Sequence, residues 1–237
     1  MNLRSSAHVA IVMAAGCFAS PSVSQNPVTA FPNNYKLVLD NKDVSVLRVH
    51  YGPHETVGVH DHSAYTTVYI YLNDSGQVLF SHQEAKPFDI TRPPTHTGAF
   101  RVSPGRIERH TVKNLSDLPS DFVRVEFKRV PIRTLRAEFR GPAPEQPLIP
   151  GASVAYRSGP IQIERIICDA NSDCALASST HPSVLIAIQS LTITAGAAPQ
   201  QLDPAQPAAW IPAGMASSLH NNGTGPAQAV RLTLRGR

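Results

Sequence analysis

The sequence predicts an all-β protein in which one β module occurs twice along the chain. Three observations support this prediction. Apolar and polar residues alternate in short runs that are separated by turns, as in "DFVRVEFKRV" from Asp121. No segment carries a helical pattern of apolar residues longer than a couple of turns. The 21 prolines among 237 residues suit many short strands joined by irregular loops, as in a sandwich or a barrel.

The repeat is visible as three pairs of similar segments that occur in the same order. "IQIERIIC" from Ile161 is similar to "VSVLRVHY" from Val44, and "VRLTLR" from Val230 is similar to "VRVEFK" from Val123. Between them, "HPSVLIAI" from His181 is similar to "HSAYTTVYIYL" from His62. Chance similarity among Val-rich strands would not be expected to preserve this order. The chain is therefore expected to fold as two copies of one module.

The Pro-rich stretch "GPAPEQPLIPG" separates the two copies. We expect a first module at residues 36–130, a linker at 131–154 and a second module at 155–237.

The first 24 residues have the features of a secretory signal peptide. Arg4 lies in a short polar start, an apolar run follows from Val9 to Ala19, and small residues suited to cleavage come next. The run is too short to span a bilayer. An alternative is lipoprotein processing, in which Cys17 would become a lipidated N-terminus. We therefore expect an exported protein, periplasmic or extracellular, that contacts a membrane only if it is lipidated at Cys17.

Two cysteines remain after the leader, in the segment "CDANSDC". Cys168 and Cys174 are an even pair in an exported chain, and the residues between them favour a turn, so we expect a disulfide bond. The alternative is a pair of reduced thiols.

The charge of the chain argues against a nucleic-acid partner. The formal net charge is only +4. The one basic cluster runs from Lys128 to Arg140, is interrupted by proline, and carries no accompanying nucleic-acid motif. We interpret it as part of a solvated connector between the two modules.

The segment "GVHDH" raises the question of a metal site. His60 and His62 are two residues apart, so in a strand both side chains lie on one face. Neutral imidazoles are good ligands for divalent transition metals. A third histidine, His110, would complete a ligand set if the fold brings it near the pair.

These residues resemble the two motifs of the cupin superfamily, whose fold is a double-stranded β-helix or jelly-roll barrel. His60 and His62 match the HXH element of the first motif. Gly105, His110 and Asn114 match the second motif, with the spacing before His110 off by one. The resemblance implies two tandem cupin barrels and a divalent ion (Fe, Mn, Ni, Cu or Zn) bound by His60, His62 and His110.

The first barrel departs from the family at the metal-binding glutamate. Its position falls at Thr66 or Thr67, and neither side chain can supply a carboxylate. Three-histidine centres occur in some cupin dioxygenases, so this loss does not by itself abolish metal binding. It removes a negative charge that would balance the cation.

The second barrel is expected to be degenerate. "WIPAG" and Asn221 are similar to the second motif, but Ser217 stands at the histidine position. Aligned on the first half, the HXH pair becomes Ser179-Thr180-His181, which leaves His181 alone of the ligand set. We therefore interpret this barrel as structural.

Two functions remain open. The first is an exported metal-dependent enzyme acting on a small molecule, oxygenase-like or of another type; the second is a non-catalytic ligand-binding or structural envelope protein with a vestigial metal site. No residue is an evident catalytic base, although Glu108 would share a strand face with His110. We expect His82 and His96 to be solvated. Exposed strand edges would allow a homodimer.

Overall fold

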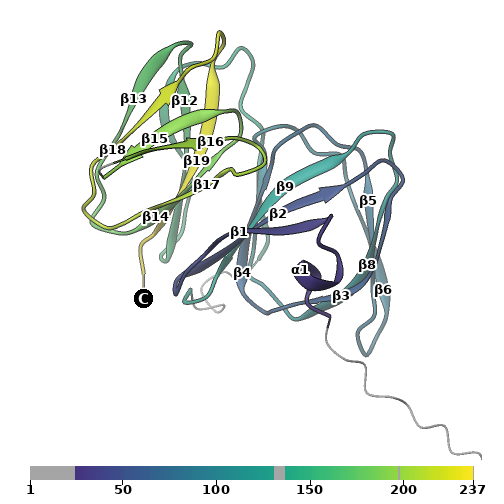
Figure 1. Cartoon of the computed structure of the whole chain (residues 1–237). Helices are drawn as coiled ribbons and strands as arrows, with labels where there is room; N and C mark the ends of the chain where they lie inside the picture. Colours follow the sequence, from purple (N-terminus) through teal and green to yellow (C-terminus); the bar gives the residue numbers. More distant parts are fainter. Residues whose placement is uncertain (1–24, 131–136, 197, 237) are drawn as a thin grey trace, which may run out of the picture.

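The computed structural model describes residues 25–130, 137–196 and 198–236, and almost all regular structure in them is β-strand. Figure 1 shows two barrels side by side, with the short helix α1 (Pro27–Ala30) at the first. The prediction of an all-β fold with tandem barrels is confirmed. The predicted signal peptide, residues 1–24, lies outside the described residues. In the described part of the chain, no helix has the length and apolar character needed to cross a membrane.

Each barrel consists of two antiparallel sheets, a larger and a smaller one. In the first barrel the larger sheet has the order β1 (Tyr35–Asp40), β2 (Val44–Tyr51), β9 (Ser120–Phe127), β4 (Thr66–Tyr71), β7 (Phe100–Ser103) and β10 (Phe139–Gly141), and the smaller has the order β3 (Thr56–His62), β8 (Glu108–Asn114), β5 (Val78–His82) and β6 (Phe88–Arg92).

The second barrel repeats this topology. Its larger sheet has the order β11 (Gly151–Arg157), β12 (Ile161–Cys168), β19 (Ala227–Leu234), β14 (Ser183–Ala187) and β17 (Ala208–Ile211), and its smaller sheet has the order β13 (Ser172–Leu176), β18 (Ser217–Asn221), β15 (Leu191–Ala195) and β16 (Pro199–Leu202).

The register shows that the two barrels are equivalent residue by residue. β2 pairs with β9 from Val44 opposite Phe127, and β12 pairs with β19 from Ile161 opposite Leu234. Asn114 and Asn221, the last residues of β8 and β18, are both buried, and each donates Nδ2–H bonds to loop carbonyls. The repeat in the sequence therefore corresponds to a repeat in structure.

The segment between the barrels contains more structure than a linker. The range predicted as linker, 131–154, contains β10, which pairs with β7 of the first barrel, and the start of β11 at Gly151. A strand of three residues is too short to show alternation, and the prolines nearby dominate the local pattern. Residues 131–136 lie outside the described part of the chain.

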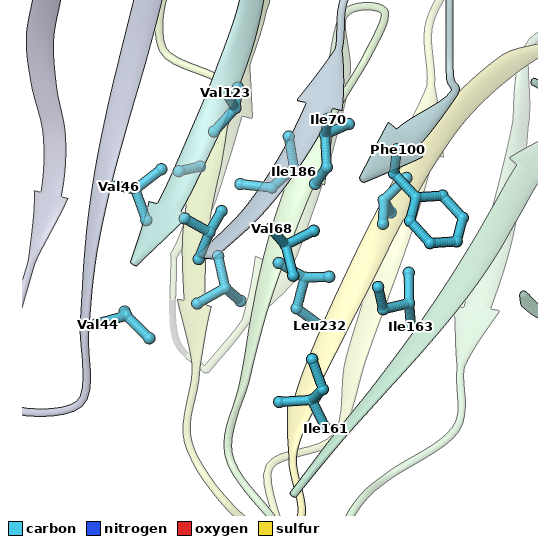
Figure 2. Close-up of a cluster of buried hydrophobic side chains, with 14 of the residues drawn as sticks. Val44, Val46, Val68, Ile70, Phe100, Val123, Ile161, Ile163, Ile186 and Leu232 are labelled. Carbon is cyan, nitrogen blue, oxygen red and sulfur yellow. The ribbon is translucent and has the colours of Figure 1, made fainter. Parts of the chain in front are cut away.

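A shared apolar core joins the two larger sheets (Figure 2). Val46, Val68 and Val123 come from the first barrel, and Ile163 and Ile186 come from the second; all five are fully buried. Successive side chains of a strand point to opposite faces, so this packing uses one face of β2, β4 and β9. The other face of the same strands is left to line the interior of the first barrel.

The predicted disulfide bond is present. It joins Cys168, the last residue of β12, to Cys174 in β13. The turn between them contains Asn171 with a positive φ of 46°, a backbone conformation that asparagine adopts more readily than most residues.

Candidate metal centre

The three predicted histidines meet inside the first barrel. His60 and His62 lie on β3 and His110 lies on the neighbouring β8, directly opposite His60. One ring nitrogen from each lies within 4.8 Å of the other two, and all three residues are buried. The i, i+2 spacing on β3 and the cross-strand pair with β8 together create the cluster.

His60 is held in one tautomer. Its Nδ1–H donates to the carbonyl oxygen of Gly58 at 2.9 Å, so Nε2 carries a lone pair. The hydroxyl of Tyr35 donates to this nitrogen at 2.7 Å. Metal-binding histidines commonly donate their second ring N–H to a carbonyl in this way, which fixes the ring orientation.

Within the described part of the chain, neither ring nitrogen of His110 has a hydrogen-bond partner, although the residue is only 2% exposed. Buried polar atoms are almost always satisfied, and an unsatisfied one costs about 1–3 kcal/mol. His60 contacts the ring edge-on at 4.7 Å between centroids, which provides packing and no hydrogen bond. The ring nitrogens of His110 are therefore suited to binding a metal ion.

The environment keeps all three imidazoles neutral. Burial lowers the pKa of His60 and lowers that of His62 well below its ordinary range. Burial, followed by the repulsion that a protonated His60 ring would exert, lowers the pKa of His110 to about 2. The guanidinium of Arg124 lowers all three further. Neutral rings keep the lone pairs that a metal ion requires.

Arg124 is the main fixed charge beside the cluster. Its Nε–H donates to Glu126 at 2.7 Å and its Nη1–H donates to the Tyr69 hydroxyl at 2.7 Å, while the Glu108 carboxylate lies 3.6 Å from Nη1. Glu108 lines the same cavity as His110, as the alternation on β8 predicts. The carboxylates nearest the cluster thus face an arginine.

The position of the missing glutamate is occupied as the sequence indicates. Thr66 and Thr67 are both buried at the start of β4, and the Thr67 hydroxyl donates to the carbonyl of Tyr65 at 2.9 Å. Neither threonine is among the residues that line the cavity.

The cavity beside the histidines is small and lined mainly by aromatic, histidine and arginine side chains, including Tyr35, Tyr69 and Arg101. Its volume is about 40 Å³. One water molecule needs roughly 10–15 Å³ of such space, so the cavity holds about three waters. An ion with water ligands fits, and an organic molecule requires side chains at the mouth to move.

A fourth histidine was missed by sequence reasoning. His82 is 4% exposed, so the prediction that it is solvated was wrong. It lies opposite His110 on β5, stacks on Phe88 at 4.5 Å, and contacts Arg106 at 3.1 Å. The alternation of Val78, Phe80 and His82 was the available signal, since these three share the inward face. His96, by contrast, is largely exposed.

The second barrel lacks the histidine cluster, but the predicted correspondence of its residues was partly wrong. Ser217 does take the place of His110, and Leu176 stands opposite it, where the first barrel has His60. Ser179 and His181 lie in the loop between β13 and β14. That loop is longer than the one between β3 and β4. An alignment that counts back from β14 by the spacing of the first barrel therefore ends in the loop and does not reach β13.

Comparisons with known proteins identify the fold. No family model matches the chain, and no curated protein matches it. Among solved structures, AerE from Microcystis aeruginosa superposes with a TM-score of 0.60 at 9% identity, covering 85% of this chain and 97% of AerE. YhaK from Escherichia coli gives a TM-score of 0.57 at 11% identity, covering 86% of this chain and 92% of YhaK.

A third match is a variant of salicylate 1,2-dioxygenase from Pseudoaminobacter salicylatoxidans in complex with gentisate. It has a TM-score of 0.50 at 11% identity, covering 81% of this chain and 68% of the dioxygenase. YhaK and the dioxygenase are cupin proteins. At these identities the likeness concerns the fold. The chain therefore has the cupin fold, arranged as two tandem barrels of which the first carries the three-histidine cluster.

Proposed function

We propose that the first barrel binds one divalent metal ion through His60, His62 and His110, and that the protein is a metal-dependent enzyme acting on a small molecule. The observation that carries this proposal is His110, whose two buried ring nitrogens have no hydrogen-bond partner among the residues that the structure describes. An ion bound there would satisfy one of these nitrogens and would offset the cost of burying it.

Three imidazole nitrogens are good ligands for Fe, Ni, Cu and Zn, and we include Mn among the ions proposed for this site. Three protein nitrogens leave coordination positions open for water, dioxygen or substrate, and the bound ion would supply Lewis-acid or redox chemistry. The chain's own groups would position and tune these ligands: Gly58 holds the tautomer of His60, and burial, aided by the charge of Arg124, lowers the pKa of each imidazole and keeps it neutral. An oxygenase-like reaction fits this arrangement.

The charges around the cavity bear on the class of substrate. Arg92, Arg101 and Arg124 line it together with Glu108. Glu138 pairs with both Arg92 and Arg101, and Glu126 pairs with Arg124. The three neutral histidine ligands contribute no negative charge against that of the ion. We therefore propose a small anionic substrate. The dioxygenase structure is in complex with gentisate, which supports a small molecule as the ligand of this protein as well.

Export is also a proposal. It rests on the leader in residues 1–24 and is supported by the Cys168–Cys174 disulfide, because such bonds persist mainly in oxidising compartments. Lipid attachment at Cys17 is the alternative form of the exported protein.

A second function has a specific observation in its favour. The Tyr35 hydroxyl already occupies the lone pair of His60, no carboxylate stands at the motif position, and the cavity holds little more than water. These features suit a non-catalytic binding or structural protein in which the site is vestigial.

Metal analysis separates the two functions. The mature protein, stripped with a chelator and then titrated with Fe, Mn, Ni, Cu or Zn, should bind one equivalent of at least one of these ions. The His110→Ala variant should lose that binding. His220→Ala is the matched control, because His220 is a half-exposed histidine in the second barrel, paired with Asp173.

The outcomes are distinct. If the wild-type protein binds none of the five ions, the enzyme proposal fails and the vestigial-site alternative stands. If His110→Ala, shown to be folded by circular dichroism, binds as tightly as the control, the ligand assignment is wrong.

A further inference from the structure

We propose that Tyr35 is a fourth protein ligand of the ion, with its phenolic oxygen taking the place of the carboxylate that the first motif lacks. This inference rests on the proposed function, since it concerns the same ion. It assigns a residue that lies outside both cupin motifs, on the first strand of the barrel.

The position of the hydroxyl is the first argument. The Tyr35 oxygen lies 2.7 Å from Nε2 of His60, and it points its hydrogen at that nitrogen because the Nδ1–H of the ring is already used on Gly58. An ion bound to Nε2 at about 2.0–2.1 Å needs the same lone pair. The hydroxyl must then either give up its hydrogen and bind the ion or move away.

The packing around Tyr35 favours binding over movement. The residue is 1% exposed, and its ring lies 5.0 Å from that of His60 and 5.8 Å from that of His62. The ring of Tyr51 contacts it edge-on at 6.1 Å. A close-packed aromatic side chain of this kind has little room for another rotamer.

Tyr51 provides the supporting hydrogen bond. Its oxygen lies 2.7 Å from the Tyr35 oxygen, and since the Tyr35 hydrogen points at His60, the Tyr51 hydroxyl is the donor. When the oxygen of Tyr35 binds the ion, its proton leaves to the solvent, as it does when other protein ligands bind metals. The Tyr51 O–H then donates to the resulting phenolate, whose negative charge offsets part of the charge of the ion.

The second barrel acts as an internal comparison. Where it has lost the histidines it has also lost both tyrosines, whereas it has kept a buried asparagine and a buried arginine. By register, Ala152 replaces Tyr35 and Cys168 replaces Tyr51. Leu176 likewise replaces His60, and Ser217 replaces His110. Asn221 corresponds to Asn114, and Arg231 corresponds to Arg124. The tyrosine pair thus varies together with the metal-binding histidines, while the asparagine and arginine do not.

The test is spectroscopic. The mature protein loaded with iron(III) or copper(II) should show a visible phenolate-to-metal charge-transfer band and tyrosinate modes by resonance Raman. Tyr35→Phe should abolish both and lower the affinity for the ion at least about tenfold. Tyr51→Phe should retain a shifted band. Tyr69→Phe is the matched control, because Tyr69 lines the same cavity but bonds to Arg124, and its band should match that of the wild type.

Three results would overturn the inference. A wild-type protein that binds one equivalent without the band leaves the proposed function intact and removes Tyr35 from the ligand set. A folded Tyr35→Phe variant that binds the ion equally or more tightly shows that the hydroxyl competes with the ion. A wild-type protein that binds no ion overturns this inference and the proposed function together.

Discussion

In the first barrel, the buried ring of His110 has two nitrogens without a hydrogen-bond partner among the described residues. His110 is surrounded by His60, His62, His82 and Phe80, all in aromatic contact, and receives no hydrogen bond. Arg124, by contrast, is satisfied by Glu126 and Tyr69. The second barrel keeps the equivalent Arg231, paired with Glu164, so this arginine has a structural role in both halves. The histidines have no such counterpart, which is why we assign them to the site.

The depressed pKa of His110 predicts a pH dependence for the metal-free protein. In the unfolded chain the imidazole titrates near about 6.5, whereas in the folded protein it stays neutral down to about pH 2. Between these values the unfolded state binds a proton that the folded state does not. The free energy of unfolding should therefore be highest above about pH 6.5 and fall below it by about 1.4 kcal/mol per pH unit for this residue alone.

Urea denaturation of the chelator-treated protein at about pH 7.5 and about pH 5 measures this effect. The His110→Gln variant should lose less stability between the two pH values than the wild type. His220→Gln, altered at a half-exposed ring, should follow the wild type. Equal pH dependence in all three proteins would contradict the expectation.

At the scale of elements, strand alternation and the turns between strands position the site. β8 directs Glu108, His110 and Val112 inward, and its neighbours β3 and β5 place His60 and His82 on either side of His110. The turn before β8 contains Gly105 with a φ of +80°, a conformation that favours glycine. A Cβ on this residue would fall on the backbone carbonyl of Tyr65. The turn therefore fixes how β8 approaches the start of β4.

Gly105→Ala should destabilise the protein. The left-handed backbone alone costs about 1–2 kcal/mol for a residue with a Cβ, and the clash with Tyr65 adds to this. The variant should also bind the ion more weakly, since β8 must shift. Gly159→Ala is the control, because that glycine has no atom within 4 Å of the added Cβ. Thermal unfolding and metal titration check both effects; equal stability of the two variants would contradict the role of the turn.

At the scale of the whole molecule, the two barrels share one apolar core. Both larger sheets bury a face in it, so β2, β4 and β9 are covered on both sides, by the second barrel and by the interior of the first. The second barrel, which lacks the metal cluster, thus supports the sheet that carries Arg124 and Tyr69. This explains why a barrel without the metal cluster is part of the molecule.

The shared core predicts a single cooperative unfolding transition. Trp210, the one tryptophan in the chain, reports on the second barrel, and five of the six tyrosines lie in the first. Fluorescence and near-UV circular dichroism should therefore give the same midpoint. Ile186→Ala in the shared core should lower the free energy of unfolding by about 2–5 kcal/mol and shift both signals together.

Ile149→Ala is the control for that experiment, because Ile149 is 77% exposed and should cost little. Two separated transitions in the wild-type protein, or a shift confined to the tryptophan signal in Ile186→Ala, would show that the barrels unfold independently.

Much of the fold and part of the site could be predicted from the sequence. Alternation and turns indicate strands, the repeated segments indicate two modules, and the spacing of His60 and His62 puts them on one face. These are local properties, set by the two-residue period of a strand. The disulfide pair also followed from local spacing and was confirmed.

The remaining features depend on pairing between distant strands. His82 contacts His110 because β5 lies beside β8, and Tyr35 reaches His60 because β1 adds to the edge of the larger sheet. The strand register identifies which residues of the second barrel correspond to the metal-binding histidines of the first. The sequence does not show this correspondence, because the loop between β13 and β14 is longer than the loop between β3 and β4. The sequence by itself determined the strands, the repeat and the candidate ligands. Tertiary structure decided what surrounds those ligands, because cross-strand register and loop length bring together residues that no local pattern connects.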